Sequence, residues 1–278
     1  MTDPEPATAT VADVVDVVHR RYDPTSAEAW DAVGLVCGDP GAPVHRVLVA
    51  VDAVAVTVDE ALALGADLLV THHPLLLHPV SSVAATTPAG RLVHRLVRAG
   101  CALLAAHTNA DVAPEGVSDA LAATLGIRSA VPLVTGLAGP TTGLGRVGEL
   151  DGAVSLAAFA GTVREALPAT AQGVRVAGDP ERRVHRVAVI GGSGGDALGS
   201  AARAGADVVV TSDLRHHVTS DFIAAPGGPA VIDVAHFASE WPWVPVVARL
   251  IRDDLALARR PVQVHVSTVV TDPWTFHR

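Results

Sequence analysis

The sequence predicts an α/β fold made of two related halves, in which mostly parallel sheets are covered by helices. Apolar, β-branched runs alternate with amphipathic helical patterns, which is typical of parallel strands joined by helices. An internal repeat relates residues 44–73 to residues 184–213. Because 278 residues suffice for two ordinary domains, we expect the two copies of the repeat to belong to two halves.

The first half is expected to follow the order strand, helix, strand, helix, strand after an N-terminal helix. Gly65 follows one apolar helical pattern, at a position that favours a left-handed backbone. The expected elements are a helix over 11–21, a strand over 44–52, a helix over about 57–64, a strand over 68–70, a helix over 88–99 and a strand that begins at 101.

The second half is interrupted by segments that favour turns. Residues 129–145 are rich in Gly, Pro and Thr, and no element is predicted there. After them we expect a strand near 147–150, a helix near 155–167, a strand that runs into a long helix with an apolar face within 230–257, and a last strand over 262–270. The resulting domain prediction is an N-terminal half over 1–130, a connecting segment over 131–183 and a C-terminal half over 184–278.

The two copies of the repeat share several short motifs in one register. Both contain V-H-R-V at the start of a strand, G-A-D before the next strand, and Thr at the end of that strand. In the first copy the strand then continues into His72 and His73, whereas the second copy has Ser212 and Asp213. Two related strand–helix–strand units are therefore expected, with different chemistry at their tips.

The composition excludes several classes of function. The net charge is −9, and all 20 basic residues are Arg, so neither a nucleic-acid footprint nor a lysine-dependent cofactor or phosphate loop is expected. No apolar stretch is long enough to span a membrane, and the N-terminus is acidic where a signal peptide is basic. We expect a cytoplasmic protein without a membrane partner. Cys37 and Cys101 are expected to be buried apolar residues rather than nucleophiles.

Histidines and carboxylates gather after three of the predicted strands. His72 and His73 stand at a strand tip before Pro74, and Asp111 follows the next strand. His236 and Glu240 are four residues apart where a further strand enters a helix, so both side chains can reach one ion. Ligands in open α/β sheets bind outside the carboxyl ends of strands, so these five residues are candidate metal ligands.

Two bridging carboxylates and three imidazoles favour a dinuclear site over a mononuclear one, with two divalent ions per chain. Zinc, manganese, iron and nickel all suit these ligands. The alternative is that His72 and His73 only end a strand and Asp111 only caps a helix. That alternative gives no reason for adjacent histidines beside a proline.

Several motifs in the chain resemble the Nif-three-like family, whose members are often described as GTP cyclohydrolase I type 2 homologues. The motifs are WDAVGL (30–35), LLVTHHPLLL (68–77), AAHTNAD (105–111), VAVIGGSGGD (187–196), VVVTSDLRHH (208–217) and DVAHFASEWP (233–242). The resemblance implies a two-domain α/β fold, a dinuclear metal centre bound by the same five residues, and a toroidal homohexamer. It also implies the compact form of the family, without a domain inserted between the halves.

Other residues near the candidate ligands have two readings. His107 and Asn109 could orient Asp111 without binding the metal themselves, or could simply pack at a strand end. His216 and His217 match a family motif near the site and are candidates for the substrate side. The GGSGGD loop at 191–196 could offer N–H groups to a phosphate, or could be a tight turn.

The leading hypothesis is a metal-dependent hydrolase that acts on a nucleotide-like or phosphorylated small molecule, with its metal site between the two halves. No residue is assigned as catalytic. The alternative is a metal-binding regulatory, storage or scaffold protein without turnover. Five protein ligands leave positions on two ions open for water and substrate, which favours the enzyme.

Overall fold

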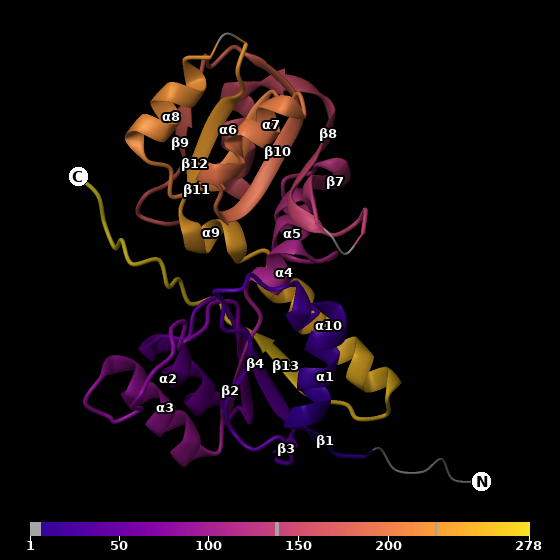
Figure 1. Cartoon of the computed structure of the whole chain (residues 1–278), viewed down its shortest axis with the longest axis vertical. Helices are drawn as coiled ribbons and strands as arrows, with labels where there is room; N and C mark the ends of the chain where they lie inside the picture. The colour runs from indigo at the N-terminus through magenta and orange to yellow at the C-terminus, as the bar shows by residue number, and fades with distance from the viewer. Residues whose placement is uncertain (1–6, 137–138, 226) are drawn as a thin grey trace. The chain divides into compact units, whose positions relative to one another are not determined.

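The chain forms two compact units, shown in Figure 1. The computed structural model describes residues 7–136, 139–225 and 227–278. Unit 1 contains the described residues up to Ala110 together with Val244–Thr271, and unit 2 contains Asp111–Trp243 and Asp272–Arg278. Each unit is built around its own sheet.

Unit 1 has a five-stranded sheet in the order β13-β4-β5-β6-β2. The first four strands are parallel, and β2 pairs with β6 in the antiparallel direction. The elements of unit 1 are β1 (Ala9–Thr10), α1 (Val11–Arg21), the 3-10 helix η1 (Pro24–Ser26), β2 (Gly34–Cys37), β3 (Pro43–Val44), β4 (Arg46–Ala50), α2 (Ala55–Leu64), β5 (Leu68–Thr71), α3 (Pro88–Ala99), β6 (Ala102–Ala105), the start of α4 (Thr108–Val112), most of α10 (Trp243–Leu257) and β13 (Gln263–Val266).

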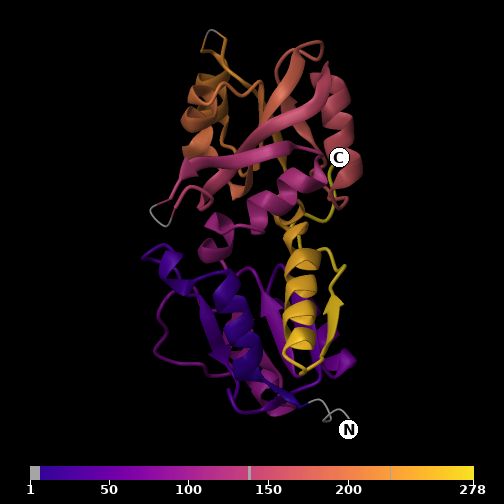
Figure 2. The same cartoon turned by 90° about the vertical axis from the view of Figure 1, so that its right-hand side faces the viewer.

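Helices cover both faces of this sheet. Leu48, Leu69 and Leu103 project from three neighbouring strands into one core cluster with α2 and α3. Figures 1 and 2 show α1 and α10 together on the other face, where Arg21 is paired with Asp254 at 2.6 Å. The three inner strands β4, β5 and β6 are buried on both faces, which explains their continuous apolar sequences.

Unit 2 has a six-stranded sheet in the order β7-β8-β10-β11-β12-β9. Only the three central strands, β10, β11 and β12, are parallel to one another, so this sheet is mixed rather than mostly parallel. The remaining elements are α5 (Val117–Thr124), β7 (Arg128–Thr135), β8 (Gly143–Ser155), α6 (Leu156–Ala166), β9 (Arg175–Ala177), β10 (Arg183–Ser193), the 3-10 helix η2 (Gly195–Ala197), α7 (Leu198–Arg203), β11 (Val208–Ser212), α8 (His216–Ile223), β12 (Ala230–Val234) and α9 (His236–Glu240). One core cluster includes residues of α5, α6 and α9, and another includes residues of α7 with α8 packed against it.

These limits differ from the predicted segments 1–130, 131–183 and 184–278. Residues 131–183 are not a connector, because β7 and β8 pair with each other and β8 pairs with β10. At the other end of the chain, β13 pairs with β4, so the C-terminal helix and strand belong to unit 1. Apolar periodicity identifies strands but does not identify their partners, which is why the boundaries were misplaced.

The internal repeat corresponds to the same local structure in both units. In unit 1, Asp67 Oδ2 accepts hydrogen bonds from the backbone N–H groups of His45 at 2.7 Å and Arg46 at 2.9 Å. The Arg46 guanidinium in turn donates to the carbonyl of Leu64 at 2.8 Å, and Gly65 ends α2 with a left-handed φ of 61°. The V-H-R-V and G-A-D motifs thus form one clasp at the amino ends of β4 and β5.

Unit 2 contains the same clasp. Asp207 Oδ2 accepts from the N–H groups of His185 and Arg186, both at 2.8 Å, and Arg186 Nε donates to the carbonyl of Ala204 at 2.8 Å. Gly205 has a left-handed φ of 71°, like Gly65. The repeat is therefore a structural device that joins strand, helix and strand, and the candidate functional residues lie at the opposite ends of the strands.

Within the described ranges, no helix combines the length and the apolar composition that a bilayer crossing requires.

Candidate metal centre

His72 and His73 follow the carboxyl end of β5, as predicted. The backbone N–H groups of both residues donate to the carbonyl of Val51, at 3.0 and 2.9 Å. The His72 side chain is fully buried, and its Nδ1 lies 2.9 Å from the carbonyl oxygen of Ala106. A carbonyl oxygen only accepts, so Nδ1 carries the proton and Nε2 carries the lone pair that a metal ligand needs.

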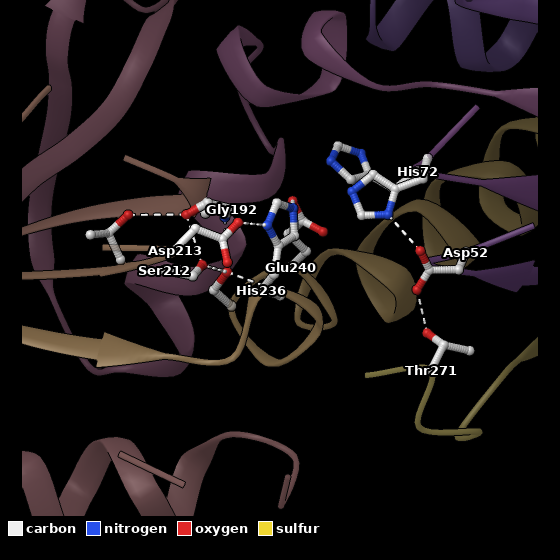
Figure 3. Close-up of polar contacts among 12 residues, drawn as sticks. Asp52, His72, Gly192, Ser212, Asp213, His236, Glu240 and Thr271 are labelled. Atoms are coloured by element: carbon white, nitrogen blue, oxygen red, sulfur yellow. Dashed lines mark hydrogen bonds and ion pairs between the residues drawn. The ribbon is translucent and has the colours of Figure 1, made fainter. Parts of the chain in front are cut away.

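His73 is oriented by a carboxylate. Its Nδ1 lies 2.7 Å from Asp52 Oδ1. The other oxygen of Asp52 accepts from the Thr271 hydroxyl, and Figure 3 shows this contact between Asp52 and Thr271. Asp52 lies just beyond β4, whose Ala50 is paired in register with Thr71 of β5. The two parallel strands therefore bring the carboxylate and the imidazole together at one edge of the sheet.

His107 joins these two histidines. Its Nδ1 lies 2.8 Å from Asp31 Oδ1, while Asp31 Oδ2 accepts from the N–H of Thr108 at 3.0 Å and from its hydroxyl. The rings of His72, His73 and His107 have centroids 5.0 to 5.4 Å apart, and one ligand nitrogen from each lies within 4.8 Å of the others. The structure thus brings a third imidazole, expected only as a supporting group, into the His72 and His73 cluster.

The environment of this cluster favours a neutral imidazole facing a charged carboxylate. Burial and the nearby rings of His72 and His73 lower the pKa of His107, although Asp31 opposes the shift. Burial alone would raise the pKa of Asp31, but hydrogen bonds from Thr108, His107 and Ala32 together hold it below its usual value. Neutral imidazole is the form that binds metal ions.

Asn109 has a structural role in this region. Its Oδ1 accepts from the backbone N–H of His107 at 2.9 Å, and its Nδ2 donates to the carbonyl of Tyr22 at 2.8 Å. Asn109 therefore fixes the turn that presents His107.

Asp111 is half-buried on α4, the helix in which the chain passes from unit 1 to unit 2.

In unit 2, His236 and Glu240 occupy the two ends of α9, as their spacing predicts. His236 Nε2 lies 2.8 Å from Glu240 Oε1, and Glu240 is 3% exposed. His236 Nδ1 lies 2.6 Å from Asp213 Oδ2 (Figure 3). Asp213, which occupies the position of His73 in the repeat, is therefore the orienting carboxylate of a histidine in its own unit.

Gly192 leaves the space that these side chains occupy. Its φ is +67°, and a Cβ at this position would lie 2.6 Å from Glu240 Oε1 and 3.2 Å from His236 Nε2. Its N–H donates to Ser239 Oγ at 2.8 Å, and its carbonyl accepts from the hydroxyls of Thr211 and Ser212. The glycine-rich loop thus supports α9, in agreement with the structural reading of the GGSGGD motif.

His216 and His217 are exposed on α8, with ring centroids 5.1 Å apart. Among the described residues, neither belongs to a group of three possible metal ligands. His216 instead lines a pocket of about 420 Å³ together with Arg175 and Asp233. Its assignment to the substrate side stays a prediction.

Sequence reasoning missed the residues that hold the histidines, namely Asp31 and Asp52, and the space left by Gly192. Asp52 could have been found, because it ends the strand that neighbours β5 in any β-α-β unit. Asp31 lies 76 residues from His107 in the sequence and carries no pattern that links the two.

The donor set in each unit fits a divalent metal ion. Four imidazoles have Nδ1 next to a carboxylate or a carbonyl, which is the usual second contact of histidines that bind metals through Nε2. Unit 2 adds a buried carboxylate on the same helical face as its histidine. Fold and side chains together define an α/β protein with a candidate centre of histidine and carboxylate ligands.

The chain belongs to the Duf34/NIF3 (NGG1p interacting factor 3) family, which it matches over residues 9–273. It is 48% identical to the GTP cyclohydrolase 1 type 2 homolog of Streptomyces coelicolor over 269 residues, which cover 96% of this chain and 94% of the relative. It is 35% identical to the homolog of the same name from Mycobacterium tuberculosis, with 95% and 96% of the two chains covered. That alignment spans 370 positions, so the mycobacterial protein has segments that this compact chain lacks.

Solved structures show the same fold. A Bacillus cereus protein related to NIF3 superimposes with a TM-score of 0.89 at 24% identity, covering 97% of this chain and 99% of the other. The Staphylococcus aureus protein SA1388 gives a TM-score of 0.88 at 28% identity, covering 98% and 100%. The predicted α/β fold and family are thus confirmed.

Proposed function

We propose that the protein is a metal-dependent hydrolase that acts on a nucleotide-like or phosphorylated small molecule. The ligands proposed for two divalent ions per chain are His72, His73, Asp111, His236 and Glu240. The observation that carries the proposal is the anchoring of Nδ1 in His72, His73 and His107 by a carbonyl or a carboxylate, which favours the tautomer that binds metal through Nε2. The name shared by the relatives supports a nucleotide as the substrate.

His107 is proposed as an additional imidazole of the centre. It shares the 4.8 Å cluster with His72 and His73, and Asp31 holds its Nδ1 as Asp52 holds that of His73. Bound divalent ions would activate water and polarise the bond to be cleaved. The protein contributes histidine rings that are oriented through Nδ1 and the buried carboxylate of Glu240.

Zinc, manganese, iron and nickel remain the candidate metals, because histidine and carboxylate ligands suit all four. A homohexamer is proposed from the family resemblance. A cytoplasmic location without a nucleic-acid or membrane partner is proposed from the charge and hydropathy of the sequence. The mass of the native particle, measured by light scattering, tests the assembly.

The test begins with metals per chain, measured by mass spectrometry on purified protein. His72→Ala and Glu240→Ala are each expected to lower occupancy while leaving the circular dichroism spectrum unchanged. Arg164→Gln is the matched control, since Arg164 is exposed and paired only with its neighbour Glu165 in the described structure. Unchanged occupancy in both ligand variants would contradict the ligand set.

Activity is then measured on a panel of nucleotides and phosphoesters, with and without chelator. Turnover that is lost with chelator and restored by one metal is the expected result. Two bound metals per chain without turnover on the whole panel would overturn the hydrolase proposal. That outcome would instead favour a metal-binding regulatory, storage or scaffold protein.

A further inference from the structure

A pocket of about 620 Å³ in unit 2 combines aromatic and charged side chains. Arg175 of β9 and Asp213 of the loop after β11 contribute charged groups, and Trp274 and Phe276 contribute rings from the C-terminal tail. Figure 1 shows this tail in yellow beyond β13. All four residues belong to unit 2, so the pocket is formed within one unit.

The two rings are unusually exposed for their size. Trp274 is 69% exposed and Phe276 is 74% exposed, although both line a pocket that contains charged groups. The guanidinium carbon of Arg278 lies 6.0 Å from the centre of the Phe276 ring, in a cation–π arrangement. Exposed rings beside cations form a surface on which a planar heteroaromatic group can stack.

Arg175 is oriented by a buried carboxylate. Its Nε donates to Asp233 Oδ2 at 2.8 Å, and a second guanidinium nitrogen donates to the same oxygen. Gln172 Nε2 also donates to this oxygen, at 3.1 Å. The Asp233 side chain is 8% exposed, whereas that of Arg175 is 61% exposed, so the guanidinium is fixed from behind and faces solvent. A guanidinium presented in this way can bind a phosphate with two parallel hydrogen bonds.

The pocket also reaches the candidate metal centre of its own unit. Asp213 lines it, and Asp213 Oδ2 lies 2.6 Å from Nδ1 of His236. A ligand in the pocket would therefore lie beside the carboxylate that orients this histidine. The two rings, the guanidinium and the carboxylate that orients a candidate metal ligand thus line the same pocket.

We propose that this pocket binds a planar heteroaromatic ring that carries a phosphate, as in a nucleoside monophosphate. Trp274 and Phe276 stack on the ring, and Arg175 binds the phosphate. The identification of this ligand as the substrate rests on the proposed hydrolase function, whereas binding itself can be measured without turnover.

The test uses the full chain, with and without chelator, and three probes in equilibrium dialysis: guanosine monophosphate, guanosine and ribose 5-phosphate. The monophosphate is expected to bind most tightly, also in metal-free protein. Trp274→Ala should weaken the binding of the monophosphate and of guanosine about tenfold, because the base loses one aromatic ring on which it stacks. Ribose 5-phosphate binding should be unchanged in this variant.

Arg175→Gln should weaken the monophosphate and ribose 5-phosphate about tenfold and leave guanosine unchanged. Because this change removes the cation beside Asp233, Arg175→Lys is measured as well. The lysine variant keeps the charge, is expected to fold, and should show an intermediate loss. Arg164→Gln, at an exposed arginine on α6, should bind all three probes like the native protein.

The proposal is overturned if metal-free protein does not bind the monophosphate, or if Trp274→Ala binds it with unchanged affinity. It is also overturned if Trp274→Ala changes only the oligomeric state, because the rings would then form a contact between copies of the chain. Metal content and turnover are measured separately, so failure of this binding site is distinguishable from failure of the hydrolase proposal.

Discussion

Replacing Gly192 by alanine tests the candidate metal centre at a residue that donates no ligand atom. The new Cβ would lie 2.6 Å from Glu240 Oε1, whereas ordinary contacts begin near 3.4 Å. The oxygen must therefore retreat by about 0.8 Å, because the backbone of Gly192 is tied to Ser239 and Ser212 by hydrogen bonds. Metal–ligand distances vary by only about 0.2 Å, so this shift is large for a ligand.

Two effects are expected from Gly192→Ala. Its φ of +67° is unfavourable for alanine, which costs about 1–2 kcal/mol of folding free energy. Displacement of Glu240 and His236 should in addition weaken metal binding by at least about tenfold, the range found when groups around a metal site are disturbed.

Gly205→Ala separates these effects. Gly205 has nearly the same φ, +71°, but a Cβ there would meet no atom within 4 Å. This variant should lose similar stability in urea unfolding and keep its metal affinity, measured by competition with a chromophoric chelator. If the Gly192→Ala and Gly205→Ala variants have the same metal affinity, whether native or reduced, the assignment of His236 and Glu240 as ligands is refuted.

Four further predictions concern residues outside the ligand set. Asp213→Asn should lower metal affinity about ten- to hundredfold in chelator competition without changing the melting temperature, since the charge that orients His236 is lost; unchanged affinity would contradict this role. Asp207→Ala leaves two backbone N–H groups without their acceptor and should cost about 1–3 kcal/mol in urea unfolding. Although its partial burial opposes ionisation, hydrogen bonds from Thr10 and the guanidinium of Arg260 hold the pKa of Asp13 below 3.8, so its stabilisation is complete above that pH and lost as the pH falls through the folded-state pKa. The difference in urea midpoint between the native protein and Asp13→Asn should therefore be present at neutral pH and shrink in acid. Burial raises the pKa of the Cys101 thiol to about 12, so a thiol reagent should modify Cys101 at mildly alkaline pH only after unfolding.

The helices with clear periodicity and end signals were predicted closely. The helix expected over 88–99 is α3 (Pro88–Ala99), which begins after the N-cap Thr87 and ends at Gly100 with a φ of 72°. The helix over 11–21 is α1, and Thr10 and Asp13 form a capping box at its start. In both cases the signals are local, so the sequence around the helix contains them.

The sheet of unit 2 was predicted less well because its outer strands depend on distant partners. Residues 128–135 and 143–155 form β7 and β8, two long antiparallel strands, although the Gly-rich and Pro-rich sequence suggested no element over much of these ranges. The short strand β9 pairs with β12, more than 50 residues later. Strand pairing at this separation is decided by packing, which local composition does not report.

The candidate site was predictable to the extent that it lies at strand ends. His72 and His73 were found because paired imidazoles after a buried strand have no packing purpose. Their orienting partners were not, since Asp52 becomes relevant only when the register of two parallel strands is known. The ligand set as a whole stays a prediction.

In both units the amino ends of the strands carry the structural clasp, whereas the carboxyl ends carry the candidate functional residues. Asp67 and Asp207 secure the amino ends of their strands in the same way, while the carboxyl ends have diverged. Position 52 of the first copy is an aspartate that holds a histidine, and the equivalent Gly192 of the second copy makes room for one. Residues at the carboxyl ends of the strands can therefore be substituted, in evolution or in protein engineering, without removing the hydrogen bonds at the amino ends. Such a scaffold can acquire new chemistry in one half while the other half keeps its existing chemistry.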